Sequence, residues 1–315
     1  PGKKPVRSRY QLVLDFSRKE VVDYIYGQIS SLLDTVPIEY LKWDMNRSIA
    51  DVYSNGAKPE EQGKVLHQYV LGLYDFLERL HRNYPQVLIE GCSGGGGRFD
   101  AGMLYYTPQI WCSDNTDAVE RIKIQYGTSF AYPSCTVGSH VSAVPNHQTG
   151  RMTELATRAA VAMAGSFGYE LDLNLLTEEE KEQVREQIKN YHRFEMLIRQ
   201  GRYYRLTDVW QTKEYAAWEY CAPDESEALV TVITMDTQCN PATEYVKLRG
   251  LGEDKKYRVE VVGMQTDGEN VQRINGTPNA VEPEYFTGAQ LVHAGLPVPR
   301  LGNEYKSWQV YVKEV

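Results

Sequence analysis

The chain has 315 residues, 42% of them hydrophobic and 11% aromatic, and a formal net charge of −8 at pH 7. This length and composition are enough to bury a large core and favour more than one domain. Acidic and basic residues are interspersed under a negative balance, which argues against nucleic acid or an anionic membrane surface as the main partner.

Residues 10–33 begin a regular pattern with a strand and a helix. The run YQLVLDFS at 10–17 is mostly apolar and typical of a strand, and residues 19–33 have apolar positions at helical spacing. We therefore expect the first βα unit here.

The next predicted strand, YLKWDMN at residues 40–46, alternates polar and apolar side chains. Lys42, Asp44 and Asn46 alternate with a tryptophan and a methionine. Successive side chains of a strand point to opposite faces, so this strand brings an ammonium, a carboxylate and an amide to one place near its end. A helix is predicted over residues 62–82.

Strands and helices keep alternating up to residue 199. Near-continuous apolar strands separated by helices are typical of parallel βα units. The last helix opens with TEEE, in which Thr177 and Glu180 have capping-box spacing. The further strands are expected at 86–95, 110–115 and 134–142, and the further helices at 99–106, 117–127, 151–166 and 177–199.

The pattern changes after about Arg205. Short runs alternate polar and apolar residues, as in ALVTVITM (228–235) and YRVEVVGM (257–264), and turns rich in Gly, Asn, Asp and Pro separate them. This pattern predicts an antiparallel β-sandwich. We therefore expect an α/β domain at 1–205 and an antiparallel β domain at 206–315.

The carboxyl ends of the predicted strands carry acidic side chains. Parallel βα folds place their functional groups at these ends, where this chain has Asp44 and Asp114. Two carboxylates about 5–5.5 Å apart are what retaining glycoside hydrolysis needs, one as the nucleophile and one as the acid/base. The residues alone leave this assignment open, because acidic residues are common at strand ends.

The glycine run GCSGGGG at residues 91–97 allows several interpretations. It has neither the GxGxxG spacing of a dinucleotide site nor a Walker lysine followed by Ser or Thr. A backbone without side chains can approach a ligand such as a sugar closely, and a flexible turn would use the same residues. Cys92 has no histidine at a motif-like distance, so a packing or contact role is expected rather than that of a nucleophile.

Four longer motifs resemble a known family. The motifs KWDMNR, EGCSGGGGRFD, WCSDNTDAVERIKIQYGTS and VGSHVSAVPNHQTGR are similar to those of the bacterial α-galactosidases of glycoside hydrolase family 36, the melibiase and raffinose-degrading group. The resemblance runs from about Arg9 to Asp172. It implies the C-terminal portion, about strands 4–8, of a (β/α)8 TIM barrel, followed by the β-sandwich.

The resemblance also implies roles for individual residues. Asp44 takes the place of the family's nucleophile, and Asp114 takes the place of its acid/base. The positive charge of Lys42 near Asp44 favours an ionised nucleophile, whereas Asp114 has to be protonated at the start. The residues that the resemblance assigns to substrate binding are Arg9, Lys42, Asn46, Cys92 and Gly95.

Structural roles are expected for other polar residues near the strand ends. Asp117 stands at a helix start, where we expect it to cap the helix rather than compete with Asp114 as the acid. His140 and Asp15 are expected to be hydrogen-bonded structural residues, and His147 is expected to belong to loop architecture.

Five βα units are fewer than the eight of a complete barrel, which takes about 250 residues. We therefore expect this chain to be a piece of a longer enzyme, as the absence of an initial Met also indicates. The resemblance implies an α-galactoside such as melibiose or raffinose as the substrate, and a dimer or tetramer as the parent. The alternatives are an α-N-acetylgalactosaminidase, a galactosyl transferase of the raffinose-synthase type, and a non-catalytic carbohydrate-binding or assembly module.

The apolar runs and the cysteines indicate neither a membrane nor an oxidising compartment. No run of about 18 apolar residues exists, and the basic N-terminus lacks the apolar region of a signal peptide. The five cysteines have no tight spacing pattern, so we expect neither a disulfide framework nor a zinc site. A cytoplasmic location and no cofactor are the resulting expectations.

Overall fold

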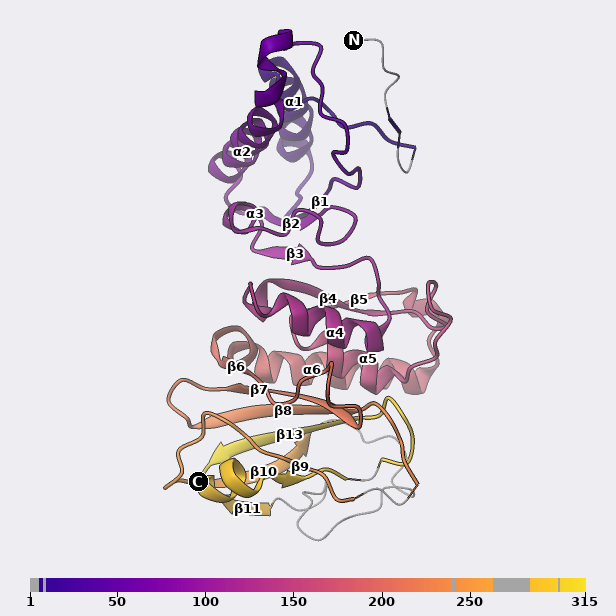
Figure 1. Cartoon of the computed structure of the whole chain (residues 1–315), viewed down its shortest axis with the longest axis vertical. Coiled ribbons are helices and arrows are strands. Elements are labelled where there is room, and N and C mark those ends of the chain that lie inside the picture. Colours follow the sequence, from indigo (N-terminus) through magenta and orange to yellow (C-terminus); the bar gives the residue numbers. More distant parts are fainter. Residues whose placement is uncertain (1–5, 8–9, 240–241, 263–283, 300) are drawn as a thin grey trace. The chain divides into compact units, whose positions relative to one another are not determined.

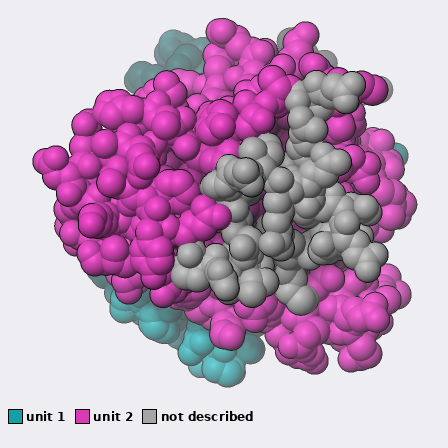
Figure 2. Space-filling model, turned by 90° about the horizontal axis from the view of Figure 1, so that it is seen from below, with its two compact units in different colours: residues 1–114 teal, residues 115–315 magenta. Residues whose placement is uncertain are grey.

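The computed structural model describes residues 6–7, 10–239, 242–262, 284–299 and 301–315 (Figure 1). The chain forms two compact units, Pro1–Asp114 and Asn115–Val315, which Figure 2 colours separately. Arg9, which the family resemblance assigns to sugar binding, lies outside the described residues.

Unit 1 contains three parallel strands and the helices that follow them. The strands lie side by side in the order β1, β2, β3, with Lys42 opposite Glu90 and Asp44 opposite Cys92. The strands are β1 (Tyr40–Asp44), β2 (Leu88–Cys92) and β3 (Gln109–Trp111), and the helices are α1 (Lys19–Thr35), η1 (Pro59–Lys64), α2 (Val65–Asn83) and α3 (Ala101–Tyr106).

One face of these strands is packed against helix α2, and this packing decides which side chains face the other way. Trp43 and Ile89 join the buried leucines of α2, and the ring of Trp43 lies 4.8 Å from that of Phe76. Side chains alternate along a strand. The opposite face therefore carries Tyr40, Lys42 and Asp44 from β1, Glu90 and Cys92 from β2, and Gln109 and Trp111 from β3.

The strand expected at residues 10–17 is wrong. Residues 12–15 form no strand, Phe16 and Ser17 form a turn, and Leu12 and Leu14 are about half exposed. Backbone groups of an apolar run become a strand only where a neighbouring strand accepts their hydrogen bonds. None of the strands in the described part of the chain pairs with this segment.

Unit 2 contains a parallel pair of strands, β4 (Val137–Ser142) and β5 (Ser166–Glu170). The sequence patterns missed β5, because they extended the preceding helix to residue 166. Helix α5 ends at Ala162, and Gly168 of β5 pairs with His140 of β4. A β-carbon on Gly168 would stand 2.5 Å from His140 Nδ1, so this position favours glycine. The helices of this part are α4 (Ala118–Thr128), α5 (Leu155–Ala162) and α6 (Glu178–Gln200), with short 3-10 turns η2 (Ser134–Thr136) and η3 (Leu173–Leu175).

The start of α6 confirms the predicted capping box. The Thr177 hydroxyl accepts the Glu180 N–H at 3.1 Å, and the Glu180 carboxylate accepts the Thr177 N–H at 2.9 Å. These two bonds satisfy two of the backbone donors that a helix start leaves open, so the local sequence fixes where α6 begins.

An antiparallel sheet forms the rest of unit 2, in the order β11-β10-β13-β8-β7-β6. Helices α4, α5 and α6 cover one face, as Figure 1 shows, and the described strands β9 and β12 and helix η4 contribute to the apolar core on the other. The strands are β6 (Arg202–Arg205), β7 (Tyr215–Cys221), β8 (Glu227–Thr234), β9 (Tyr245–Val246), β10 (Lys256–Val262), β11 (Glu284–Thr287), β12 (Leu296–Pro297) and β13 (Ser307–Glu314), and the helix is η4 (Gln290–Ala294).

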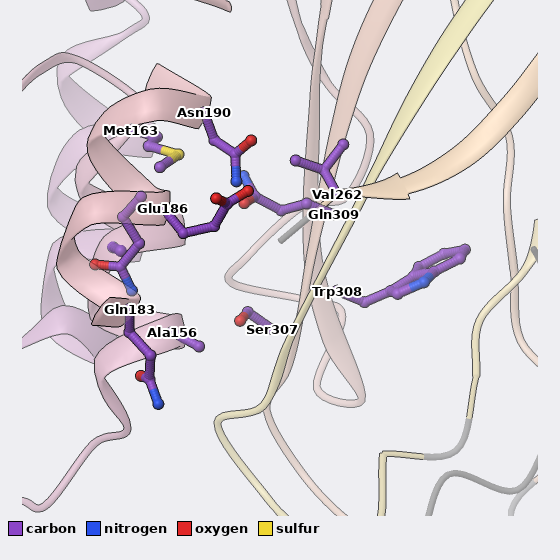
Figure 3. A pocket seen from close by; sticks show the side chains of 11 residues that line it. Ala156, Met163, Gln183, Glu186, Asn190, Val262, Ser307, Trp308 and Gln309 are labelled. Carbon is purple, nitrogen blue, oxygen red and sulfur yellow. The ribbon is translucent and has the colours of Figure 1, made fainter. Parts of the chain in front are cut away.

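A small cavity of about 50 Å³ lies within unit 2 between α6 and strand β13. Figure 3 shows Glu186 and Asn190 of α6 facing Ser307 and Gln309, whereas Trp308 points to the opposite side of β13. The space is too small for a sugar ring and belongs to the packing seam between helices and sheet.

Candidate active site

Asp44 ends β1 with its side chain exposed on the face that the helices leave open. The amide of Asn46 donates a hydrogen bond of 2.5 Å to Asp44 Oδ2. The oxygen of the same amide accepts the backbone N–H of Gly94 at 2.9 Å. The nitrogen and the oxygen of the Asn46 amide are therefore both hydrogen-bonded, and Asn46 connects the Asp44 carboxylate to the glycine-rich loop.

Cys92, at the end of β2, borders the same carboxylate. Its side chain is buried, and burial, together with the neighbouring Asp44 carboxylate, raises the pKa of its thiol to about 11, although a backbone hydrogen bond from Gly95 acts in the opposite direction. Because the thiolate is the reactive form, Cys92 is not a nucleophile near neutral pH. A contact role, as expected from the sequence, is consistent with this environment.

The glycine loop after β2 lies directly on the backbone that follows β3. Gly94 and Gly95 have φ values of +55° and +81°, which favour glycine. A β-carbon on Gly95 would stand 2.8 Å from both the Asp114 nitrogen and the Ser113 Cα, and one on Gly96 would stand 2.7 Å from a carbonyl oxygen of the same segment. Asp44 and the half-buried Asp114 are thus linked through Asn46 and two adjacent glycines.

Two polar side chains that the sequence analysis did not single out hold this loop to the end of β1. Ser93 Oγ donates to the Met45 carbonyl at 2.7 Å. Arg98 donates to the same carbonyl at 2.6 Å and to the Arg47 carbonyl at 3.2 Å. The arginine in GGGGRFD was the available signal, because a cation after a glycine run can hold the loop through its carbonyls.

Lys42 lies two residues before Asp44 on β1, and its side chain is 34% exposed. Its ammonium is 3.7 Å from Glu90 Oε1 and 5.0 Å from the centre of the Trp111 ring. The Tyr40 hydroxyl donates to the other oxygen of Glu90. The sequence analysis missed Glu90, whose signal was a single charge inside the apolar run VLIEGC.

Asp117 has the structural role that the sequence predicts. It caps α4 by accepting the Val119 N–H at 2.8 Å, and it forms a 2.6 Å ion pair with Arg151. Burial acts to raise the pKa of this carboxyl, but hydrogen bonds from Thr149 and Arg151 outweigh it and hold the pKa below its ordinary value. A carboxyl whose pKa is held low in this way is poorly suited to donate a proton.

Asp15 is also structural, as expected. Its carboxylate accepts the Ser17 N–H at 3.1 Å and the hydroxyl of Ser54, and these bonds fix the turn before α1. His147 lies in an exposed turn, and His140 stands on β4 opposite Gly168. Within the described residues, no group of three or more His, Cys, Asp or Glu side chains is arranged to hold a metal ion.

Parallel strands alternating with helices, with carboxylates after their carboxyl ends, are typical of an α/β protein of the barrel type, in which functional groups gather at these ends. The chain belongs to the melibiase family, whose model matches residues 1–201, and residues 215–312 match the glycosyl hydrolase family 36 C-terminal domain. No helix in the described part is long and apolar enough to cross a membrane.

The chain is similar over its whole length to named α-galactosidases. It is 54% identical to the bifunctional alpha-galactosidase/sucrose kinase AgaSK of Mediterraneibacter gnavus, of which it covers 30%, and 43% identical to alpha-galactosidase AgaA of Geobacillus stearothermophilus, of which it covers 40%. A solved structure of an AgaA variant in complex with raffinose matches the whole chain with a TM-score of 0.90 at 42% identity, and the match covers 41% of that structure. The chain therefore spans about 30–40% of the length of these curated relatives.

Proposed function

We propose that this chain is part of a longer retaining α-galactosidase, which removes terminal α-linked galactose from oligosaccharides such as melibiose and raffinose. The named relatives support the activity, and solved relatives in complex with raffinose and stachyose support the substrate class. Because the chain covers less than half of each of these relatives, the proposed activity belongs to the longer protein.

In this proposal Asp44 is the nucleophile and Asp114 is the acid/base. The observation that carries the assignment is the contact series in which Asn46 binds both Asp44 and Gly94 while Gly95 lies on the Asp114 backbone. A further support comes from the AgaA variants solved with raffinose and stachyose. The two aspartates replaced in them are separated by the same number of positions as Asp44 and Asp114.

The reaction would proceed by double displacement. The ionised carboxylate of Asp44 attacks the anomeric carbon of galactose, the bond from that carbon to the leaving oxygen breaks, and Asp114 gives its proton to that oxygen. Water then attacks the galactosyl ester, Asp114 takes a proton from this water, and the Asp44 carboxylate leaves. Two inversions at the same carbon retain the anomeric configuration.

The remaining site residues would hold the sugar. The Lys42 ammonium has three donors, of which the Glu90 carboxylate faces one side, so the others can reach sugar hydroxyls. The Asn46 amide keeps one N–H beyond the bond to Asp44, and Gly95 lets the ring approach the backbone. The protonated Cys92 thiol supplies a contact surface. Arg9 keeps the sugar-binding role that the family resemblance implies.

We also propose the finer architecture. Residues 1–205 would form about strands 4–8 of a (β/α)8 barrel, and residues 206–315 an antiparallel β-sandwich, with strand β6 at the junction. The longer protein would be a cytoplasmic dimer or tetramer. No step of the proposed reaction calls for a metal or another cofactor.

The roles of the two aspartates can be separated in the longer enzyme. Asp44→Ala and Asp114→Ala should each lower the hydrolysis of a nitrophenyl α-galactoside by roughly 1,000-fold or more, with raffinose binding retained. Added azide should then give the β-galactosyl azide with Asp44→Ala and the α-galactosyl azide with Asp114→Ala. Azide replaces the Asp44 carboxylate in the first variant, and in the second it replaces the water that attacks the galactosyl ester. Unchanged turnover, or exchanged azide products, would contradict the assignment.

Two alternatives use the same residues. An α-N-acetylgalactosaminidase needs room beside the second carbon of the sugar, and a galactosyl transferase prefers a sugar to water as acceptor. A panel of nitrophenyl glycosides with and without raffinose as acceptor distinguishes both from the hydrolase. A carbohydrate-binding module would bind raffinose but turn over none of the panel, even as the longer protein.

A further inference from the structure

Glu90 is a buried carboxylate on the face of the sheet that carries Asp44. Its side chain is 2% exposed, and it stands on β2 between Lys42 of β1 and Gln109 of β3 in the strand register. Burying a carboxylate is costly unless charge or hydrogen bonds compensate. A buried glutamate in an otherwise apolar strand is therefore a candidate for a functional role.

The two oxygens of Glu90 face different partners. Oε2 accepts the hydroxyl of Tyr40, and the amide of Gln109 donates to that hydroxyl at 3.4 Å. Oε1 receives no hydrogen bond from the described residues and faces the Lys42 ammonium at 3.7 Å. Tyr40 and Gln109 thus fix the carboxylate, and its unsatisfied oxygen is the one directed to Lys42.

Lys42 needs such a partner to hold one position. A lysine side chain has four carbon–carbon bonds and a strongly hydrated charge, so it is mobile unless restrained. The centre of the Trp111 ring lies 5.0 Å from the ammonium, and Glu90 Oε1 lies 3.7 Å from it. Because Lys42 and Asp44 are two residues apart on β1, the ammonium held by these two contacts lies on the sheet face that ends in Asp44.

We propose that Glu90 is a positioning residue, which holds the Lys42 ammonium in place for the sugar. The proposal rests on the function proposed above, in which Lys42 binds galactose hydroxyls. Glu90 itself touches neither the sugar nor the reacting atoms, and it acts through the orientation and charge balance of Lys42. Loss of its charge therefore weakens galactose binding more than it slows the chemical step.

The test is a double-mutant cycle in the longer enzyme, with Glu90→Gln, Lys42→Met and the combination. Gln keeps the volume of Glu90 and an acceptor for Tyr40, but removes the charge. Glu90→Gln should lower kcat/KM for a nitrophenyl α-galactoside roughly 10-fold, mostly through KM, and Lys42→Met should lower it more. The combination should be no worse than Lys42→Met alone, because Glu90 has no other route to the sugar.

Strand β8 supplies a matched control. Glu227 accepts the hydroxyl of Tyr311 across the antiparallel sheet, which is the same tyrosine–glutamate pair on a different framework. Glu227→Gln should change kcat/KM by less than twofold. Glu90→Asp, which keeps the charge on a shorter stem, should recover part of the loss and serves as the second variant if Glu90→Gln folds poorly.

The outcomes separate this inference from the proposed function. An equal loss from Glu90→Gln with and without Lys42, or a loss confined to kcat, would overturn the positioning role while the galactosidase remains. Failure of the unsubstituted longer enzyme to hydrolyse any nitrophenyl α-galactoside would overturn the function itself. Unchanged kinetics for Lys42→Met would remove Lys42 from sugar binding, and the positioning role with it, without affecting the roles of the two aspartates.

Discussion

Gly95 lies against the backbone nitrogen of Asp114, at a distance that excludes any side chain: a β-carbon there would stand 2.8 Å away. The contact joins the loop after β2 to the first residues after β3. The φ of Gly95, +81°, is a second reason for glycine at this position, because residues with a side chain rarely adopt this backbone angle. The contact between the backbones of Gly95 and Asp114 therefore fixes the distance between the glycine loop, which Asn46 holds, and Asp114.

Gly95→Ala should separate these backbones and lower kcat/KM of the longer enzyme roughly 100-fold, because a misplacement near 1 Å has about this effect on an oriented reaction. The measurement is the hydrolysis of a nitrophenyl α-galactoside. Gly302→Ala is the matched control, since Gly302 has a φ of +85° and no atom within 4 Å of a built β-carbon. It should cost about 1 kcal/mol of stability and leave kcat/KM unchanged. Similar kinetics for the two variants would show that the contact does not position Asp114.

Asn46→Asp should disturb the same site through charge. The substitution keeps the shape but places a second carboxylate 2.5 Å from Asp44 Oδ2, where an amide N–H now lies. A like charge disfavours ionisation, so the acid limb of the kcat/KM profile should move to higher pH, and activity should fall most at low pH.

A second asparagine provides the control for this change. Asn174 donates to Asp172 at 2.9 Å, the same arrangement two residues apart, but in the exposed turn η3. Asn174→Asp should leave the pH profile unchanged. An acid limb that stays in place for Asn46→Asp as well would argue that Asp44 is not the group titrating in that limb.

The sequence predicted the part of the site that depends on one strand. Lys42, Asp44 and Asn46 alternate with apolar residues, and alternation within a strand determines the face of each side chain without knowledge of the fold. The capping box at Thr177 is local in the same sense. Roles for Cys92 and Gly95 came from the family resemblance. The structure places Cys92 opposite Asp44 in the strand register and Gly95 against the backbone of Asp114.

Features that depend on neighbouring strands were missed. Glu90 meets Lys42 only through the register of β1 and β2, and Arg98 binds carbonyls of a segment about fifty residues earlier in the chain. The missed strand β5 and the strand wrongly predicted at residues 10–17 have the same explanation. Whether an apolar run pairs depends on the partner that lies beside it, and a local pattern does not contain this information.

Cys92 should resist alkylation although it lies in the site. Burial, aided by Asp44, raises the pKa of its thiol to about 11, so the reactive thiolate is scarce at pH 7.5. Iodoacetamide should therefore label the exposed Cys239 first, with activity retained. Mass spectrometry of tryptic peptides against time checks this order, and a Cys239→Ser variant should show little early labelling. Fast modification of Cys92 with loss of turnover would contradict it.

Glu219 should make the stability of unit 2 depend on pH. The side chain is fully buried on β7, with Oε2 accepting the Arg249 N–H at 2.7 Å, and burial raises its pKa to about 8. In the unfolded chain a glutamate titrates near pH 4.3. Between these values the unfolded state releases a proton that the folded state keeps, so the stabilisation present below about pH 4.3 is lost as pH rises toward 8.

Glu219→Gln removes this titration but keeps an acceptor for the Arg249 N–H. Relative to the variant, the natural chain should lose roughly 4 kcal/mol of unfolding free energy between pH 4.5 and 8, by the linkage of one group shifted by about 3 to 4 pKa units. Denaturant unfolding at several pH values measures the difference, and the exposed Glu304→Gln serves as the control because it should track the natural chain. A constant difference between Glu219→Gln and the natural chain across this range would mean that Glu219 is ionised in the folded protein.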